Sequence, residues 1–475
     1  MDDSLSFIMT ENNLSVSSAW DYDDLLKYNV SGPRYTSYPT ALQFHEEFSE
    51  DDYKTLARES NDHTRPLSLY LHLPFCDSLC YYCACNKVIT NNKERTSEYL
   101  NYLIREIKMQ STLFDSNRPI TQLHWGGGSP TYFSNEEMTM LMHNTARYFN
   151  LLEDDQGDYS IEIDPRSVDE ERIGLIKGLG FNRVSLGVQD FNLQVQQAIN
   201  RIQSLELVTA IVEEVRNYNF KSLNFDLIYG LPYQTPESFS ETIEQVIALS
   251  PDRLSLFNYA HMPNRFKNQR LINQETLPGP QEKLSILCNS ANTLMNAGYE
   301  HIGFDHFAKP EDELAVAQKN GSLHRNFQGY STAREADLIG LGVSSISKID
   351  GAFSQNHKSI NKYQEILADN HLPIERGYVL NQDDLIRQAV IEDLTCNNCI
   401  NSEKIEKKFK IRFSDYFSQQ IGKLDELCED GLLQKVGSKW LATPKGRVLI
   451  RNICMVFDHH LQNNQASSNL YSKTI

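Results

Sequence analysis

The sequence lacks any long apolar run and any excess of positive charge. None of its 475 residues lies in an apolar run near the roughly 18 to 20 residues that a membrane helix needs. Lys and Arg number 45 against 63 Asp and Glu, so the formal net charge is −18. A nucleic acid or an anionic membrane is therefore not expected as the main partner, although a local basic cleft could still bind an anionic small molecule. The N-terminal MDDSLSFIMT carries acids where a signal peptide has bases, so we expect a cytoplasmic protein.

The nine cysteines are not spread along the chain as in a disulfide scaffold. Four of them, Cys76, Cys80, Cys83 and Cys85, fall within ten residues. In a large cytosolic chain such a group indicates a metal or redox site. Cysteines in a C-x3-C-x2-C loop can direct three thiolates at one object, and a [4Fe–4S] cluster held by three thiolates keeps one iron open for another ligand. The alternative is a structural zinc site completed by Cys85.

The roles of Cys85 and of the pair Cys396 and Cys399 are less clearly defined by their spacing. Cys85 could be a fourth cluster ligand, a redox or proton-transfer residue, or a buried thiol, and we favour a functional role. Cys396 and Cys399 form a second close pair, but no further ligand residues lie near them in the sequence. We interpret this pair as structural.

Short apolar segments alternate with amphipathic helical segments over some 240 residues, which indicates βα units and a parallel sheet. Seven candidate strands are too many for a small doubly wound domain and suit a partial (β/α) barrel. The expected strands are 67–75, 120–128, 158–164, 183–189, 223–230, 253–260 and 300–308.

The chain divides into four predicted parts, and the fold class is α/β. Residues 1–60 form an N-terminal extension that covers the substrate, and residues 61–310 form the partial barrel. Residues 311–379 connect the barrel to the C-terminal part and complete the site. Residues 380–475 read as helix, short hairpin and helix, which suggests a small, mainly α, winged-helix-like domain.

Polar and glycine residues stand at the carboxyl ends of successive strands, where such barrels place their active sites. The run Gly126–Gly128 would let a ligand approach the backbone closely and bind free N–H and C=O groups. Glu162, Gln189 and Asp226 end the next strands. Each alone is more often a structural residue, but four successive strand ends of this kind favour a binding site.

Several motifs together resemble a known family. They are YLHLPFC, CYYCACNK, LHWGGGSPTY, SIEIDPR, GVQDFN, DLIYGLP and RVLIRNIC, with SGPRYTSYPTA near the N-terminus. The cysteine loop and the glycine run are similar to those of radical S-adenosylmethionine (SAM) enzymes. The whole set more closely resembles the oxygen-independent coproporphyrinogen III oxidase (dehydrogenase) family, over roughly residues 24–460.

The resemblance implies an oxidoreductase of porphyrin (haem) biosynthesis with one [4Fe–4S] cluster and two SAM molecules. In this family a 5′-deoxyadenosyl radical made from SAM abstracts hydrogen from the β-carbon of a propionate. Two propionates of coproporphyrinogen III are oxidatively decarboxylated to vinyl groups, giving protoporphyrinogen IX. A low-potential electron donor is also implied. We expect a monomer that binds neither nucleic acid nor membrane.

The family's site residues transfer to positions of this sequence. Cys76, Cys80 and Cys83 match the cluster ligands, and Cys85 is the catalytic candidate, which we expect not to bind iron. The family's SAM contacts fall on Tyr70, Tyr82, Gly127, Gly128, Ser129, Glu162, Gln189, Arg201, Asp226, Ala260 and Ile346. Arg34, in SGPRY, is a hypothesis for binding a substrate propionate.

Haem-chaperone-like relatives share the three-cysteine loop but typically carry phenylalanine at the position of Cys85. Cys85 and the SGPRYTSYPTA segment therefore favour the oxidase. The alternative is a relative that binds haem without catalysing this reaction.

Overall fold

The computed structural model describes residues 27–153, 155–332, 336–463 and 471–475. Residues 1–26 of the predicted N-terminal extension therefore lie outside the described part. Among the described residues, no helix combines the length and the apolarity needed to cross a bilayer.

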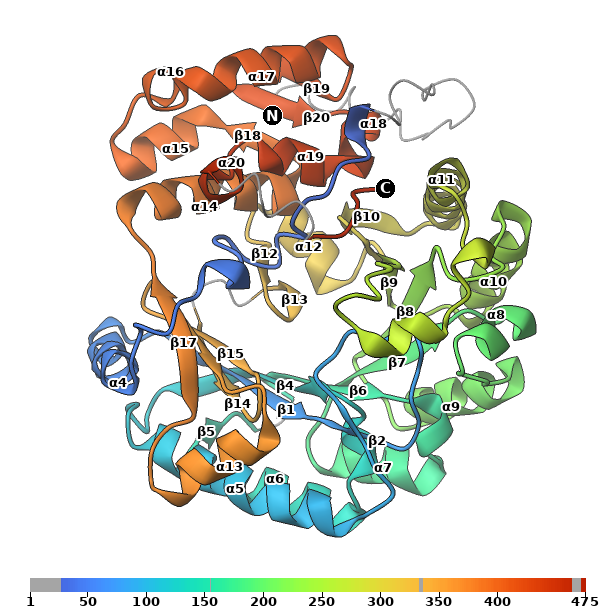
Figure 1. Cartoon of the computed structure of the whole chain (residues 1–475), viewed down its shortest axis with the longest axis vertical. Coiled ribbons are helices and arrows are strands. Elements are labelled where there is room, and N and C mark those ends of the chain that lie inside the picture. Colours follow the sequence, from blue (N-terminus) through green and yellow to red (C-terminus); the bar gives the residue numbers. More distant parts are fainter. Residues whose placement is uncertain (1–26, 154, 333–335, 464–470) are drawn as a thin grey trace.

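One large sheet organises residues 67–379 (Figure 1). Its order is β10-β11-β9-β8-β7-β6-β4-β1-β14-β15-β16-β17. Six of these strands run parallel to their neighbours as the repeated βα units require. They are β1 (Leu67–Leu73), β4 (Pro119–Gly127), β6 (Asp158–Ile163), β7 (Arg183–Gln189), β8 (Ser222–Tyr229) and β9 (Arg253–Asn258). The α/β partial barrel predicted from the sequence is confirmed.

The crossover helices lie along the outer side of the curved sheet (Figure 1). Local capping explains where several of them begin: Ser134 accepts a hydrogen bond from the backbone N–H of Glu137 and starts α6, and Ser204 starts α9 in the same way. Their buried faces pack on strand residues such as Trp125 and Phe225. The helices are α5 (Glu94–Ser111), α6 (Asn135–Tyr148), α7 (Glu170–Gly178), α8 (Leu193–Ala198), α9 (Leu205–Asn217), α10 (Pro236–Leu249) and α11 (Pro280–Asn296).

The prediction of a single strand over 300–308 is wrong. The segment forms an antiparallel hairpin of β10 (Glu300–Gly303) and β11 (His306–Ala308), and β11 runs antiparallel to β9. Gly303 and Phe304 both have positive φ, which turns the chain back on itself between the two strands. The next parallel strand is β14 (Asp337–Leu341), which pairs with β1 on the other side of the barrel.

The connecting segment contributes four strands to the main sheet. After β14 come β15 (Ile346–Ile349), β16 (Ala352–Asn356) and β17 (Ile374–Val379), which pair antiparallel in sequence order. Helix α13 (Ile360–Ala368) precedes β17 and packs on α5. A separate hairpin, β12 (His324–Asn326) and β13 (Gly329–Ser331), follows α12 (Glu313–Lys319). The sheet is therefore wider than the βα pattern predicts.

The C-terminal part has an apolar core of its own around Phe413, Phe417 and Trp440. A three-stranded sheet, β18-β20-β19, packs with the helices. The predicted last helix is broken into three short ones. The elements are α14 (Gln382–Asn397), β18 (Cys399–Asn401), α15 (Ser402–Phe409), α16 (Phe413–Tyr416), α17 (Ser418–Glu429), β19 (Leu433–Val436), β20 (Lys439–Ala442), α18 (Pro444–Val448), α19 (Ile450–Met455) and α20 (His459–Asn463).

The start of the described chain packs against this C-terminal part (Figure 1). Tyr28, Tyr35 and Tyr38 belong to its apolar core, and Ser31 bridges to Lys473. Helix α4 (Glu50–Glu59) then leads to β1. The N-terminal segment thus joins the two parts of the fold.

Candidate active site

The cysteine loop begins where β1 ends. Strand β2 (Phe75–Cys76) pairs with β3 (Val88–Ile89), which closes the loop at its base. Side-chain amides hold the loop from outside: Nδ2 of Asn268 donates to the carbonyl oxygens of Tyr81 at 2.8 Å and of Cys83 at 2.9 Å. The backbone N–H of Tyr81 donates to the carbonyl of Ile199 at 3.0 Å. Residues outside the loop therefore help to fix its conformation.

The predicted cluster ligands line one cavity of about 470 Å³. Among the described residues, no group of three His, Cys, Asp or Glu side chains is placed to hold a metal ion. The three thiols instead border a common space, and thiolates are the ligands by which proteins hold iron–sulfur clusters. The cavity also contains eight of the eleven predicted SAM contacts, which are Tyr82, Gly127, Gly128, Ser129, Glu162, Gln189, Arg201 and Asp226.

Positive charge gathers around the sulfur of Cys80. Arg201 Nη1 lies 3.6 Å and Arg166 Nη2 lies 3.9 Å from this Sγ. Both guanidinium groups also donate to Asp164 Oδ2, at 2.9 Å and 2.7 Å. Burial alone would raise the pKa of Asp164, but the two arginines lower it overall. The arrangement leaves the buried Nε of Arg201 without a hydrogen-bond partner.

Cys83 and Cys85 interact directly. The hydrogen bond from Cys85 lowers the pKa of the Cys83 thiol to about 6. The same hydrogen bond raises the pKa of Cys85 well above its ordinary value. Burial raises the pKa of Cys76 to about 12, with a contribution from the neighbouring thiols. Cys85 is the most exposed of the four cysteines and lines the same cavity.

The glycine run packs tightly against the end of β1. A Cβ at Gly127, which has φ +113°, would lie 2.5 Å from the His72 ring, and a Cβ at Gly128 would lie 2.6 Å from the carbonyl carbon of Pro74. The expectation of free N–H groups is wrong, because Gly127 N–H donates to Glu162 at 3.1 Å and Gly128 N–H donates to the carbonyl of Leu73 at 2.9 Å. These glycines permit close packing of two strand ends.

The carboxylates at the strand ends differ in environment. Glu162 accepts hydrogen bonds from Gly127 N–H and from His124 Nε2 at 3.2 Å, and these lower its pKa although burial alone would raise it. Burial raises the pKa of Asp226, which accepts a hydrogen bond from Ser185 at 2.8 Å. Gln189 is buried and has φ +66° at a break in the register of β7 with β8.

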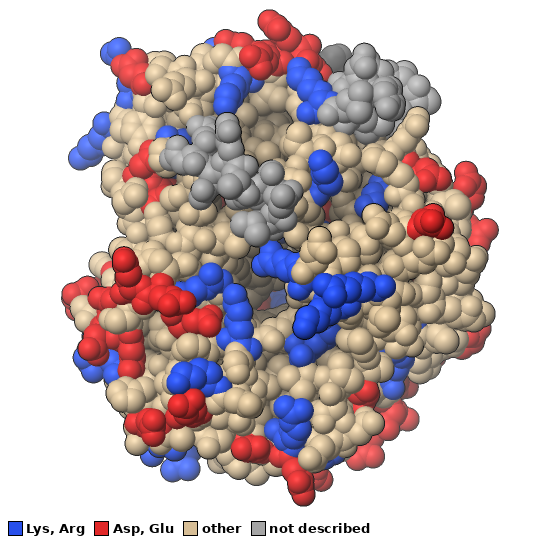
Figure 2. All heavy atoms as spheres, viewed as in Figure 1, with Lys and Arg blue, Asp and Glu red and all other residues tan. Residues whose placement is uncertain are grey.

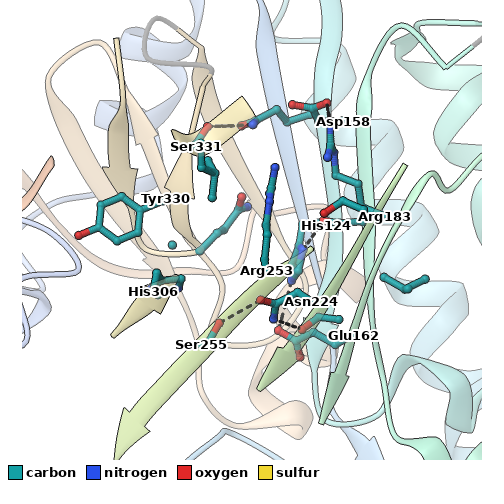
Figure 3. Close-up of a pocket in the computed structure, with 18 of the residues that line it drawn as sticks. His124, Asp158, Glu162, Arg183, Asn224, Arg253, Ser255, His306, Tyr330 and Ser331 are labelled. Atoms are coloured by element: carbon teal, nitrogen blue, oxygen red, sulfur yellow. Dashed lines mark hydrogen bonds and ion pairs between the residues drawn. The ribbon is translucent and has the colours of Figure 1, made fainter. Parts of the chain in front are cut away.

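A second cavity of about 270 Å³ continues into the barrel (Figure 3). Glu162, Ser185, Asp226 and Phe257 line both cavities. Ion pairs ring its far end, where Arg183 bridges Asp158 and Glu313 at 2.7 Å each, and Arg253 bridges Asp312 and Glu313 at 2.8 Å and 2.7 Å. The interior of the barrel is therefore polar and continuous with the space beside the cysteines.

Three predicted SAM contacts are not among the residues that line the first cavity. Tyr70 stacks on His124 with ring centroids 5.7 Å apart, and its hydroxyl donates to Nδ1 of His72 at 3.0 Å. Ala260 is half-buried, and its carbonyl oxygen accepts from Gln269 Nε2 at 3.1 Å. Ile346 packs near Phe44 and Phe353.

The remaining sequence candidates lie outside this cavity. Arg34 donates to the carbonyl oxygen of Asn258 and lines a small separate pocket of about 30 Å³ with Asp305. Cys396 is buried at the end of α14, and Cys399 lies on β18 opposite Leu441.

Sequence reasoning missed the groups that position the candidates. Asp164 and Arg166 hold Arg201 and Cys80, and His124 holds Glu162. All three lie inside motifs already singled out, SIEIDPR and LHWGGG. The sequence signal for these three residues is their position close to a predicted strand end. Their interaction partners lie far away in the sequence, so the sequence alone does not reveal these contacts.

Comparison with known proteins identifies the family. The Radical SAM superfamily matches residues 70–246, and the HemN C-terminal domain matches residues 380–449. The chain is 51% identical over 442 residues to an oxygen-independent coproporphyrinogen III oxidase of Pseudomonas aeruginosa, covering 93% of this chain and 96% of that protein. It is 46% identical to the Escherichia coli protein of that name over 457 residues, covering 96% and 98%.

A solved structure agrees with these matches. Coproporphyrinogen III oxidase (HemN) from Escherichia coli, described as a radical SAM enzyme, superposes with a TM-score of 0.88 at 45% identity. The alignment covers 93% of this chain and 99% of that one. The chain therefore belongs to the oxygen-independent coproporphyrinogen III oxidase family of radical SAM enzymes.

Proposed function

We propose that the cavity beside the cysteine loop is the active site in which this enzyme works on coproporphyrinogen III. The chain catalyses the oxidative decarboxylation of two propionate side chains to vinyl groups, which gives protoporphyrinogen IX. Its family uses a [4Fe–4S] cluster and SAM, which when bound supply the radical that takes hydrogen from a propionate. One observation carries the assignment of the cavity: Cys76, Cys80 and Cys83 share it with eight predicted SAM contacts.

The residues present fit both groups. The thiols of Cys76, Cys80 and Cys83 would bind the cluster, and the guanidinium groups of Arg166 and Arg201 lie beside the sulfur of Cys80. The unpaired Nε of Arg201 would donate to the carboxylate of SAM. Glu162 and Asp226 would accept hydrogen bonds from the ammonium group or the ribose hydroxyls, because carboxylates are acceptors only.

The proposal includes two SAM molecules rather than one. Support comes from the second cavity, which shares Glu162 and Asp226 with the first and extends it into the barrel (Figure 3). Two molecules in adjoining spaces would both lie within reach of these carboxylates. Tyr70, Ala260 and Ile346 remain proposed SAM contacts, without assignment to one of the two molecules.

The opening of the cavity suits a substrate with several carboxylates. Figure 2 shows basic side chains around a central hollow on this face. Lys358 lies beside the cysteine loop, because its backbone carbonyl accepts a hydrogen bond from Asn86, three residues past Cys83, at 3.0 Å. Partial burial lowers the pKa of Lys358, and the nearby Arg376 and Arg265 lower it further. Such a concentration of cations in an acidic chain favours binding of the four propionates of coproporphyrinogen.

We propose that Cys85 acts on the substrate and does not bind iron. It borders the cavity, is exposed, and stands next to Cys83. A thiol in this position would donate hydrogen or a proton, or would position a propionate. Arg34 stays a candidate for the substrate as well, since it contacts the carbonyl of Asn258 at the end of β9.

The proposed organisation follows the four parts predicted from the sequence. The HemN C-terminal domain match begins at residue 380, which supports a boundary there. All nine cysteines are free thiols, as is usual in the reducing cytoplasm, where we place the enzyme. We propose a monomer, without nucleic-acid or membrane contacts, that receives electrons from a low-potential donor.

The test is anaerobic SAM cleavage by reconstituted protein. With dithionite and SAM, the wild-type enzyme should hold about four irons and release 5′-deoxyadenosine. Cys80→Ala should lose both properties, whereas Cys399→Ala, a half-buried cysteine outside the cavity, should keep both. Stoichiometric zinc without labile sulfide would contradict the assignment. Tight haem binding without SAM cleavage would favour the haem-chaperone-like alternative.

A further inference from the structure

Several of the exposed large apolar side chains stand in segments that pack beside the cysteine loop. The described part of the chain exposes nine of them. Four of the nine, which we term the Leu271 patch, are Leu193, Ile202, Tyr233 and Leu271, with exposed fractions of 56%, 58%, 44% and 57%. The other five are Ile89 on the loop itself and four that are scattered elsewhere. An apolar concentration of this kind on a protein surface is typical of an interaction site.

The Leu271 patch surrounds one small apolar cluster. Each patch residue lies within three positions of a buried member of that cluster, which contains Val195, Ile199, Leu231 and Ile272. Tyr81 and Tyr82 of the cysteine loop pack against the same cluster. The patch residues therefore belong to the chain segments that pack against the cysteine loop.

Hydrogen bonds connect the patch segments to the loop. Ile199 accepts from the backbone N–H of Tyr81, and Asn200 donates to the carbonyl of Leu79 at 2.9 Å. From the other side, Asn268 of η5 (Lys267–Leu271) donates to the carbonyls of Tyr81 and Cys83. A partner seated on Ile202 and Leu271 would contact the two segments that clamp the loop.

The same segment carries positive charge. Lys267 and Arg270 are exposed on η5, next to Leu271. The chain as a whole has a net charge of −18, so an acidic partner would be repelled elsewhere and attracted here.

We infer that the Leu271 patch, with Lys267 and Arg270, is the docking surface for a small acidic protein that delivers single electrons to the cluster. The inference rests on the proposed function, because only a redox cluster behind the loop gives such a partner a role. In each transfer the carrier loses one electron and the cluster gains it. Electron-transfer encounters bury little surface and dissociate readily, as an exposed apolar patch with a basic rim allows.

The test compares a protein reductant with a chemical one in the full-length reconstituted enzyme. The probe is reduced flavodoxin, an acidic one-electron carrier, and the chemical reductant is dithionite. The double variant Lys267→Glu/Arg270→Glu should slow flavodoxin-driven formation of 5′-deoxyadenosine by about tenfold or more at low salt. Its dithionite-driven rate should stay within about twofold of the wild type. Leu271→Glu and Leu193→Glu should behave in the same way.

Matched controls and a binding readout complete the design. Val316→Glu on α12 changes another exposed apolar residue, and Lys407→Glu on α15 reverses another exposed charge, so both should leave the two rates unchanged. Binding titrations should show a lower affinity for flavodoxin only in the patch variants. The same difference should appear with enzyme that carries its cluster and with enzyme that lacks it.

The outcomes separate the inference from the proposed function. Unchanged flavodoxin-driven rates and affinity in the double variant would overturn the docking surface, and so would an equal loss with both reductants. A wild-type dimer that Leu271→Glu dissociates would assign the patch to a second copy of the chain instead. An inactive wild type under either reductant would contradict the proposed function itself.

Discussion

Replacing Gly128 by alanine tests whether the glycine run holds the cysteine loop in place. A Cβ at this position would lie 2.6 Å from the carbonyl carbon of Pro74 and 2.8 Å from the carbonyl oxygens of Pro74 and Phe75. Ordinary contact begins near 3.4 Å, so the neighbouring backbone must move by about 3.4 − 2.6 = 0.8 Å. All three clashing atoms are backbone atoms, which cannot rotate away as a side-chain end would.

Hydrogen bonds would pass this displacement on to the start of the cysteine loop. Gly128 N–H donates to Leu73 and Ser129 N–H donates to Phe75 at 2.8 Å, so the two segments are tied together. Phe75 immediately precedes Cys76, and the shift therefore reaches a cluster ligand. Overpacking of this kind costs about 1–3 kcal/mol in stability. A misplacement near 1 Å in an active site costs roughly 100-fold in rate, equivalent to about 2.7 kcal/mol.

The assay is anaerobic release of 5′-deoxyadenosine, with iron content and thermal unfolding measured on the same samples. Gly178→Ala is the matched control, because Gly178 ends α7 and a Cβ there would meet nothing within 4 Å. Alanine in place of glycine favours a helix by up to about 1 kcal/mol, so this control should keep full activity and stability. A Gly128→Ala enzyme with activity within twofold of the wild type would refute the reasoning.

Three further outcomes are expected. Cys85→Ser should keep iron and sulfide but lose protoporphyrinogen formation, and loss of iron would instead make Cys85 a ligand. Lys358→Gln and Arg376→Gln should each raise the KM for coproporphyrinogen about tenfold without changing SAM cleavage in the absence of this substrate. The control Lys362→Gln on α13 should change neither quantity. An unchanged KM for coproporphyrinogen would show that these two cations do not belong to the site. Burial raises the pKa of Glu106 from 4.5 to about 7, so the folded state retains a proton that the unfolded state releases, and stability falls as the pH rises through this window. Urea unfolding of Glu106→Gln should lack that fall, and a pH dependence equal to the wild type would contradict the assignment to Glu106.

The sequence predicts the parts of the site that depend on short-range pattern. The cysteine spacing and the strand-end positions of Glu162, Gln189 and Asp226 follow from local periodicity, and the structure brings all of them to one cavity. Periodicity also predicts β1, β4 and β6–β9, because buried parallel strands read as short apolar runs separated by helices.

What the sequence does not predict depends on contacts between distant residues. The Asp164–Arg201 ion pair joins positions 37 residues apart, and the parallel pairing of β14 with β1 joins segments some 270 residues apart. The hairpin at 300–308 is not predicted because the backbone reversal at Gly303 and Phe304 lies inside a segment short enough to be one strand. The glycine N–H groups were expected to be free because nothing local reveals that Glu162 and Leu73 accept from them.

The most direct test of the central claim is anaerobic turnover of coproporphyrinogen III by the reconstituted enzyme with SAM and a reductant, followed by mass spectrometry of the porphyrin. We expect the loss of two molecules of CO2, each with two hydrogens, and the formation of one 5′-deoxyadenosine for each CO2 lost. Cys80→Ala should leave the substrate unchanged. Substrate recovered intact from wild-type enzyme that holds its cluster and cleaves SAM would contradict the account.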